Sequence, residues 1–294
     1  MLGAIIGDIV GSVYEWDNIK TKDFPLFRDD CAFTDDSVMT CAVAEAIMNG
    51  GKKDDFIAAF KQYGKMYPDV GYGDRFFTWL FSDDNVPYNS YGNGSAMRVS
   101  PCGWLGNYEE FIGTGIVPTE VRAMAELSAK ITHNHPEGIK GAVATADAIF
   151  LTRYYFGGYH GKDEQAINDD PAACKRRLKD HIEQLYGYNL SRSLDEIRPL
   201  YTFHVSCQET VPQAIIAFLE STDFEDAIRN AISLGGDSDT IAAITGSIAE
   251  AAYGIADWIK DKAYSYLDEP LKDVLKRWHD TGLVAPSSTA WVIS

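Results

Sequence analysis

The amino-acid sequence predicts an all-α protein, folded as a single compact domain of many helices over residues 1–294. Apolar residues recur at helical spacing in nine segments, and residues that favour helix N-termini precede several of them. Sustained alternation of apolar and polar residues, the pattern of a half-buried strand, is missing, so we expect little or no sheet. The nine segments are 38–48, 56–66, 121–131, 139–155, 171–185, 211–219, 224–232, 241–253 and 271–278.

The helices have identifiable starts and are separated by irregular segments. Ser193 and Asp223 each stand three residues before an acidic residue, as N-caps do, and Thr119 is the expected N-cap of the segment that follows it. Pro136 marks another helix start, because proline is favoured in the first turn. No repeat or linker-like composition divides the chain. The segments expected to be irregular are 14–33, 82–107, 157–170 and the tail from 283.

The first segment combines small residues with isolated charges. Gly3, Gly7 and Gly11 recur every four residues, which gives a smooth helical face and permits close helix packing. A buried core helix accounts for these glycines, but not for Asp8 and Glu15, which lie at or near the ends of the apolar stretch. Buried carboxylates need partners, and nearby metal ions would supply them.

Two acidic clusters of matching composition lie far apart in the sequence. Each precedes an apolar helical segment, so N-capping is one interpretation. Like charges this close repel, however, and Mg²⁺ prefers carboxylate, hydroxyl and water oxygens as ligands. The presence of two such clusters, one behind a Gly-Gly turn that allows close backbone approach, favours a two-metal site. The clusters are Thr34, Asp35, Asp36 and Ser37, and, behind Gly235 and Gly236, Asp237, Ser238, Asp239 and Thr240.

A loop rich in glycine and asparagine spans residues 88–98. Asn, Gly and Ser tolerate positive φ, so successive backbone N–H groups can form a concave cradle for phosphate oxygens, and a helix N-terminus after the loop would strengthen it. The ring of Tyr91 could stack on a base. An ordinary surface turn is the alternative interpretation.

His133 and His135 form a His-x-His pair between two helical segments. No third histidine or cysteine lies at a spacing that would complete a zinc site. We expect one imidazole to hydrogen-bond a substrate or the polar core. A helix-connecting turn with a structural histidine is the alternative interpretation.

Composition narrows the classes of partner and location. The net charge of −17 repels nucleic-acid phosphates and no cluster of Lys and Arg offsets it, so we expect no nucleic-acid partner. The five cysteines are scattered, which fits reduced thiols better than disulfides or zinc ligands. The apolar start lacks a basic n-region and no stretch is long enough for a membrane span, so we expect a cytoplasmic protein with no membrane contact.

Five motifs follow one another along nearly the whole chain. They are G-A-I-I-G-D-I-V-G-S-V-Y-E from Gly3, F-T-D-D-S from Phe33, Y-G-N-G-S-A-M-R from Tyr91, T-H-N-H from Thr132 and S-L-G-G-D-S-D-T-I-A-A-I-T-G from Ser233. In content and order they resemble the ADP-ribosylglycohydrolase family, which includes dinitrogenase-reductase-activating glycohydrolase and the ADP-ribosylserine and ADP-ribosylarginine hydrolases. The match weakens over residues 156–201.

The resemblance implies an all-α fold with a binuclear metal cleft that takes ADP-ribose. It implies two Mg²⁺ ions, or Mn²⁺ as in some relatives, held by Thr34, Asp35, Asp36, Asp237, Asp239 and Thr240. It further implies a substrate site formed by Ser90, Tyr91, Gly92, Asn93 and Gly94 at the diphosphate, Tyr91 also being near the adenosine, and by His133. Glu15 matches a glutamate on a mobile loop that serves catalysis or gating, and with Asp36 it is a candidate catalytic residue; Asp8 is interpreted as structural.

Three functions remain open from the sequence. The first is a hydrolase that removes ADP-ribose from a protein side chain or a small conjugate, with the linkage, the choice between Mg²⁺ and Mn²⁺ and the oligomeric state undecided. The second is a two-metal phosphoesterase, which also needs clustered aspartates. The third is a catalytically silent ADP-ribose-binding protein, which retention of every acidic metal position and of Glu15 disfavours.

Overall fold

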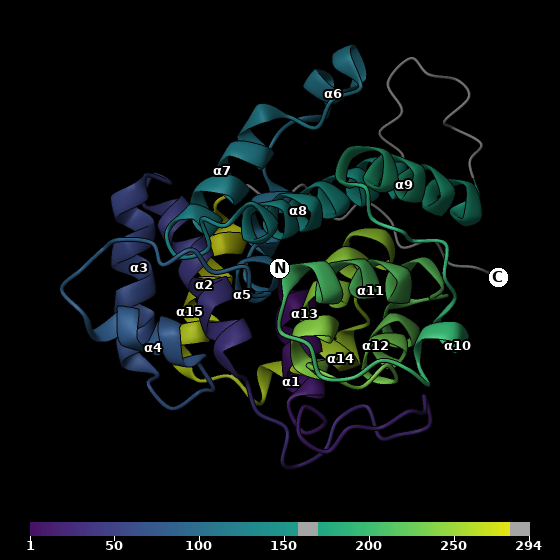
Figure 1. Ribbon diagram of the computed structural model, residues 1–294, viewed down its shortest axis with the longest axis horizontal. Helices are drawn as coiled ribbons and strands as arrows, with labels where there is room; N and C mark the ends of the chain where they lie inside the picture. Colours follow the sequence, from purple (N-terminus) through teal and green to yellow (C-terminus); the bar gives the residue numbers. More distant parts are fainter. Residues whose placement is uncertain (158–169, 283–294) are drawn as a thin grey trace.

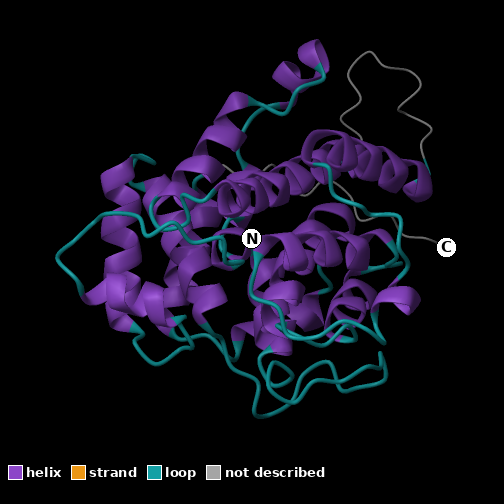
Figure 2. Cartoon of the chain, viewed as in Figure 1, coloured by secondary structure: helices purple, strands orange, loops and turns teal. Residues whose placement is uncertain are grey.

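The computed structural model describes residues 1–157 and 170–282. These residues form helices and loops without a strand, and only an isolated bridge joins Gly92 to Ser206 (Figure 2), so the predicted all-α fold is confirmed. The helices are α1 (Leu2–Gly11), α2 (Asp35–Met48), α3 (Lys53–Met66), α4 (Asp74–Phe81), α5 (Gly94–Met97), the 3-10 helix η1 (Ser100–Trp104), α6 (Tyr108–Thr114), α7 (Thr119–Lys130), α8 (Pro136–Phe156), α9 (Pro171–Tyr186), α10 (Leu194–Ile197), α11 (Cys207–Leu219), α12 (Phe224–Ile232), α13 (Ser238–Tyr253), α14 (Asp257–Tyr264) and α15 (Glu269–Asp280).

Every one of the nine predicted helical segments falls on a helix, but the sequence missed the shorter ones. Helices α4, α6 and α14 were not predicted, and α5 and η1 lie inside the segment 82–107 that was expected to be irregular. Helices of four to eight residues span too few turns for a periodic pattern to stand out. The prediction of an irregular segment at 157–170 falls largely outside the described residues, and so does the predicted tail from 283.

Two of the three predicted N-caps are confirmed. Ser193 accepts a hydrogen bond from the Glu196 amide in a reciprocal capping box, and Asp223 accepts one from Asp226. The prediction for Thr119 is wrong by one residue, because Pro118 is the N-cap of α7. Pro118 adopts the extended ψ of 138° that a cap requires although its side chain makes no capping bond.

A glycine seam brings α1 directly against α13. A Cβ placed on Gly7 would lie 2.1 Å from the carbonyl oxygen of Ala242, and one on Gly3 would lie 2.2 Å from that of Gly246. At Gly11 the nearest atom would be the Cα of Asp239, at 2.4 Å. Backbones this close admit no side chain, so the predicted role of the small residues in close packing is confirmed.

The remaining helices surround this central pair. In the view of Figure 1, helices α2, α3, α4 and α15 lie to the left of α1 and α13, helices α11 and α12 lie to the right, and α7, α8 and α9 lie above. The first turns of α2 and α13 meet at the end of α1, where the two acidic clusters are located. None of the helices in the described ranges is long and apolar enough to span a membrane.

Candidate active site

Asp8, near the end of α1, anchors the first acidic cluster. Its fully buried carboxylate accepts hydrogen bonds from the Thr34 amide at 2.9 Å, the Thr34 hydroxyl at 2.6 Å and the Ser37 amide at 3.1 Å, and from the Ser37 hydroxyl. Thr34 in turn caps α2 by accepting from the Asp36 amide at 3.4 Å. The capping interpretation therefore holds for Thr34, and the structural interpretation of Asp8 fits these bonds.

Asp237 stands at the N-cap position of α13 but does not cap it. Its side chain makes no capping hydrogen bond and instead accepts one from the Asn93 side-chain amide at 2.7 Å. Asp239, two residues later, accepts a hydrogen bond from the amide of Thr240 at 2.9 Å. N-capping thus fails to explain the carboxylate of Asp237, which is buried among other carboxylates.

The fold joins the two clusters. The hydroxyl of Thr240 donates to Oδ2 of Asp36 at 3.2 Å across 204 residues of sequence. Carboxylate oxygens of Asp8, Asp36 and Asp239 all lie within 4.8 Å of one another, and so do those of Glu15, Asp237 and Asp239. Asp239 is common to both groups, so the two potential cation positions adjoin.

Burial disfavours the charged form of these carboxylates. Burial and the negative charges of the neighbouring carboxylates hold the pKa of Asp36 and of Asp239 well above its ordinary value, and burial raises the pKa of Asp8 to about 6 against its four hydrogen bonds. Among the described residues, no ion pair within 4.0 Å includes any of these carboxylates.

The donor set fits hard divalent cations. Oδ1 of Asp36 is buried without a hydrogen-bond partner, which costs free energy unless something positive faces it. Carboxylate oxygens gathered within 4.8 Å, with the Thr240 hydroxyl bonded to one of them, are ligands of the kind that Mg²⁺ and Mn²⁺ take. A cation bound here would compensate the repulsion that the protein alone leaves unbalanced.

Asp35 and Glu15 differ in how close they come to these carboxylates. Asp35 is half-buried and belongs to neither group of close oxygens, yet burial and the charges of Asp8 and Asp237 raise its pKa well above the ordinary value. Glu15 follows α1 in a turn, and burial followed by the charge of Asp237 raises its pKa to about 7. Glu15 lies outside both clusters in the sequence, and the structure brings its carboxylate to Asp237 and Asp239.

The predicted phosphate loop lies against the second cluster, with a conformation different from the expected one. Between residues 88 and 98 positive φ occurs at Asn89 alone, so the expectation that the loop glycines use positive φ is wrong. Gly92 and Gly94 instead leave room for a neighbour, since a Cβ on Gly94 would lie 3.2 Å from Nε2 of His133. Ser90 accepts a hydrogen bond from the Gly92 amide at 3.1 Å, which tightens the turn.

Asn93 and Tyr91 point in different directions from this loop. Asn93 is buried, and its side-chain amide donates to Asp237 and, at 3.1 Å, to Thr210. The ring of Tyr91 is 51% exposed and meets the ring of His135 at 5.3 Å. The structure therefore commits the Asn93 side chain to the acidic cluster and leaves the Tyr91 ring available to a ligand.

The two histidines have separate environments. His133 is buried with Nδ1 2.8 Å from the Thr132 hydroxyl, and its pKa is held well below the ordinary value by burial and by the charge of Arg98. His135 caps α8 by accepting from the Glu137 amide at 3.1 Å. Among the described residues, neither ring belongs to a group of close metal-ligating atoms.

Arg98, for which the sequence predicted no role, hydrogen-bonds the residue that precedes His133. It is 1% exposed, donates to the Thr132 hydroxyl at 3.0 Å and to the carbonyl of Ser128 at 3.1 Å, and lies over the ring of Phe60. The one signal in the sequence was a charged residue directly after the apolar end of the loop.

Comparison with known proteins identifies the family to which this helical fold and acidic site belong. The family model described as ADP-ribosylglycohydrolase matches residues 1–287. The chain belongs to this family, and the predicted resemblance is confirmed.

Relatives and a solved structure agree with this assignment. ADP-ribosylhydrolase ARH3 of Bos taurus is 26% identical over 315 residues, which cover 87% of this chain and 84% of the relative. ADP-ribosylarginine hydrolase Tri1 of Pseudomonas putida strain GB-1 is 27% identical over 300 residues, which cover 90% of this chain and 73% of the relative. The solved structure entitled ADP-ribosylglycohydrolase-related protein complex has a TM-score of 0.63 at 20% identity and covers 95% of each chain, which supports the fold.

Proposed function

We propose that this protein is a metal-dependent hydrolase that cleaves the glycosidic bond between ADP-ribose and a modified side chain or a small conjugate, and releases intact ADP-ribose. The observation that carries the proposal is the convergence of Asp36, Asp239, Asp237 and Glu15 beside the 88–98 loop. Membership in the ADP-ribosylglycohydrolase family, and relatives named as ADP-ribosylhydrolases, support the same substrate class.

Two cations, Mg²⁺ or Mn²⁺, are the cofactors of this proposal. Their ligands would be Thr34, Asp35, Asp36, Asp237, Asp239 and Thr240. Of these, Asp36, Asp237 and Asp239 belong to the two groups of close carboxylate oxygens. When bound, the cations supply positive charge that fixes the ribose hydroxyls and orients a water near the anomeric carbon. Cleavage at that carbon develops oxocarbenium character, which the surrounding carboxylates stabilise electrostatically.

Glu15 and Asp36 are the proposed catalytic carboxylates. Glu15 lies with Asp237 and Asp239, where its carboxylate can accept a proton from water and its acid form can return one to the leaving group. Asp36 has one buried oxygen without a hydrogen-bond partner, and that oxygen is free to hold a ligand. Glu15 is the half-buried member of the pair and therefore the one that a substrate can reach.

The loop and His133 are proposed to bind the ADP portion. Ser90, Gly92 and Gly94 would line the diphosphate, Tyr91 would stack on the adenosine with its exposed face, and Asn93 would tie the loop to Asp237. Nε2 of His133 lies against Gly92 and Gly94, and the lowered pKa keeps the ring neutral, so it offers a hydrogen bond rather than a charge.

The wider setting follows from the same proposal. We propose that residues 1–294 act as one domain, that the partner is an ADP-ribosylated protein or a small conjugate, and that the protein works in the reducing cytoplasm. All five cysteines are free and buried, which supports a reducing compartment.

Product analysis tests the proposal against its alternatives. The purified protein is incubated with a panel of conjugates carrying ADP-ribose on arginine, on serine and on a nucleic-acid base, with Mg²⁺ or with EDTA. Release of intact ADP-ribose only with the cation supports the hydrolase. Release of AMP or phosphate would establish a phosphoesterase, and tight ADP-ribose binding without any product would establish a silent binder.

A further inference from the structure

Glu15 is held in place by the residue three positions after it. The side-chain amide nitrogen of Asn18 donates to the carbonyl of Tyr14 at 2.7 Å and to that of Glu15 at 2.9 Å. The same nitrogen donates to the carbonyl of Gly236 at 2.9 Å, and its oxygen accepts from the Gly236 amide at 2.7 Å. One side chain therefore binds the backbone on which Glu15 sits and, across 218 residues, the backbone directly before Asp237.

The Gly235–Gly236 turn, to which Asn18 is hydrogen-bonded, has a conformation that favours glycine. Gly235 and Gly236 have φ of 67° and 76°, which L-residues with side chains rarely adopt. A Cβ on Gly235 would lie 3.3 Å from Oδ1 of Asn18, and one on Gly236 would lie 2.8 Å from the carbonyl oxygen of Thr202. The two glycines thus present their backbone to Asn18 and turn the chain so that Asp237 enters the acidic cluster.

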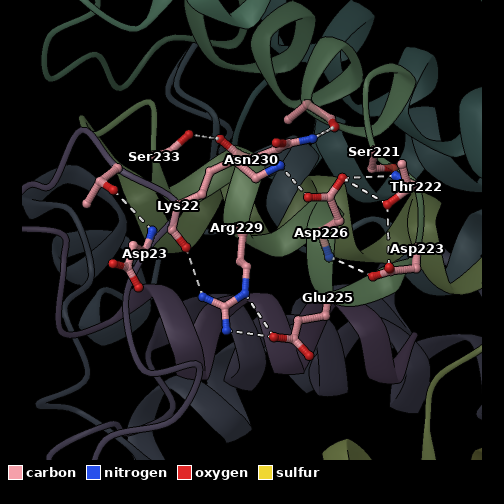
Figure 3. Close-up of polar contacts among 12 residues, drawn as sticks. Lys22, Asp23, Ser221, Thr222, Asp223, Glu225, Asp226, Arg229, Asn230 and Ser233 are labelled. Atoms are coloured by element: carbon pink, nitrogen blue, oxygen red, sulfur yellow. Dashed lines mark hydrogen bonds and ion pairs between the residues drawn. The ribbon is translucent and has the colours of Figure 1, made fainter.

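Other contacts hold the rest of the segment without touching Glu15. Lys20 donates to the carbonyls of Tyr201, at 2.8 Å, and Leu234. Further along, the guanidinium of Arg229 on α12 donates to the Lys22 carbonyl at 3.0 Å, as Figure 3 shows, and to the Phe24 carbonyl at 2.6 Å. These contacts fix the course of residues 20–24, whereas among the described residues the side chain that hydrogen-bonds both to Glu15 and to the turn before Asp237 is Asn18.

We infer that Asn18 is a positioning residue, which sets the Glu15 carboxylate against Asp237 by joining their two backbones. The inference rests on the proposed role of Glu15 in hydrolysis. Displacement of a reacting group by about 1 Å can cost about 100-fold in rate. Loss of the Asn18 hydrogen bonds is expected to lower kcat about 10- to 100-fold. KM is expected to change by less than about threefold, because among the described residues the hydrogen bonds of the Asn18 side chain go to Tyr14, Glu15 and Gly236 and not to the 88–98 loop or His133.

A double-mutant cycle tests this inference. Asn18→Ala, Glu15→Gln and the double variant are compared with the wild-type protein on the best conjugate. If Asn18 acts through Glu15, the double variant will be no slower than Glu15→Gln, because the group that Asn18 positions is already disabled. Multiplicative losses would overturn the inference, and so would an Asn18→Ala variant with wild-type kcat.

Two controls separate positioning from general loosening. Asn49→Ala removes an exposed asparagine that bonds only to Glu45, at 3.2 Å, and to backbone of its own helix end, and it is expected to keep wild-type kcat. Lys20→Met removes the neighbouring tether and is expected to stay within about threefold of wild-type kcat. A Lys20→Met loss as large as that of Asn18→Ala would mean that any slackening of the segment suffices, and would overturn the specific role of Asn18.

Hydrogen exchange provides a readout that does not depend on activity. The Gly236 amide is the one donor that Asn18 accepts from, so its exchange is expected to accelerate at least tenfold in Asn18→Ala and to stay unchanged in Asn49→Ala. Unchanged exchange would show that Asn18 does not hold the Gly235–Gly236 turn. A wild-type protein that releases no ADP-ribose would refute the proposed function, whereas turnover with a multiplicative cycle would refute only the role of Asn18.

Discussion

Replacing Gly11 by alanine should push the second acidic cluster away from the first. The added Cβ would lie 2.4 Å from Cα of Asp239, 2.7 Å from its amide nitrogen and 2.8 Å from the carbonyl oxygen of Ser238, whereas ordinary contact begins at 3.4 Å. All three atoms are backbone, so no side-chain rotation relieves the clash, and α1 and the start of α13 must separate by about 1.0 Å to raise the shortest contact from 2.4 to 3.4 Å. Overpacking of this kind costs about 1–3 kcal/mol, which outweighs the gain of up to ~1 kcal/mol from alanine's helix propensity.

The assay is thermal unfolding with and without Mg²⁺. Gly11→Ala is expected to unfold roughly 2–6 °C below the wild-type protein and to bind Mg²⁺ at least about tenfold more weakly, because Mg²⁺ tolerates little distortion of its ligands. Gly113→Ala is the matched control, since nothing lies within 4 Å of its added Cβ. A Gly11→Ala protein with wild-type unfolding temperature and Mg²⁺ affinity would refute the argument that the glycine seam positions Asp239.

Three further predictions concern the loop, the catalytic carboxylate and pH. Gly94→Val should weaken ADP-ribose binding by roughly tenfold in a calorimetric titration while keeping Mg²⁺ binding, because the new Cβ would lie 3.2 Å from Nε2 of His133. Unchanged affinity for ADP-ribose would show that the loop is an ordinary surface turn. Glu15→Gln should lower kcat about 10²–10⁴-fold with little change in affinity for the product ADP-ribose; a wild-type rate would remove it from the mechanism, and lost metal binding would make it a ligand. In the cation-free protein burial raises the pKa of Glu15 to about 7 and that of Asp8 to about 6, so their contribution to the stability of the fold is full below pH ~4 and is lost as pH rises through 6–7. The unfolding temperature in EDTA should therefore fall as pH rises, while the increase in unfolding temperature caused by Mg²⁺ should grow. A Mg²⁺-induced increase that does not change with pH would contradict this prediction.

The sequence revealed those parts of the site that depend on local pattern. The spacing of Gly3, Gly7 and Gly11 predicted a close-packed helix because residues four apart share one helical face. The paired acidic clusters predicted their own convergence, because a shared cation site explains two sets of adjacent like charges better than N-capping alone. The long helices followed from apolar periodicity over more than two turns.

Other parts of the site depend on contacts between residues far apart in the sequence. The bond from Asn93 to Asp237 spans 144 residues, and nothing in either motif indicates it. The place of Glu15 among the carboxylates depends on the segment after α1 folding back onto the Gly235–Gly236 turn. The sequence singled out the loop glycines for positive φ, which they do not adopt. In the structure glycine is needed there because a side chain would crowd His133.

Calorimetric titration of the cation-free protein with Mg²⁺ and with Mn²⁺ tests most directly whether the buried carboxylates form a cation site. The wild-type protein is expected to bind two ions and to gain about 2.7 kcal/mol of stability at a cation concentration 100-fold above Kd, because folding alone brings the two clusters together. Asp239→Asn, which alters the carboxylate common to both groups of close oxygens, should abolish that gain. A wild-type titration without saturable binding, with one unfolding temperature in Mg²⁺ and in EDTA, would contradict the two-metal site.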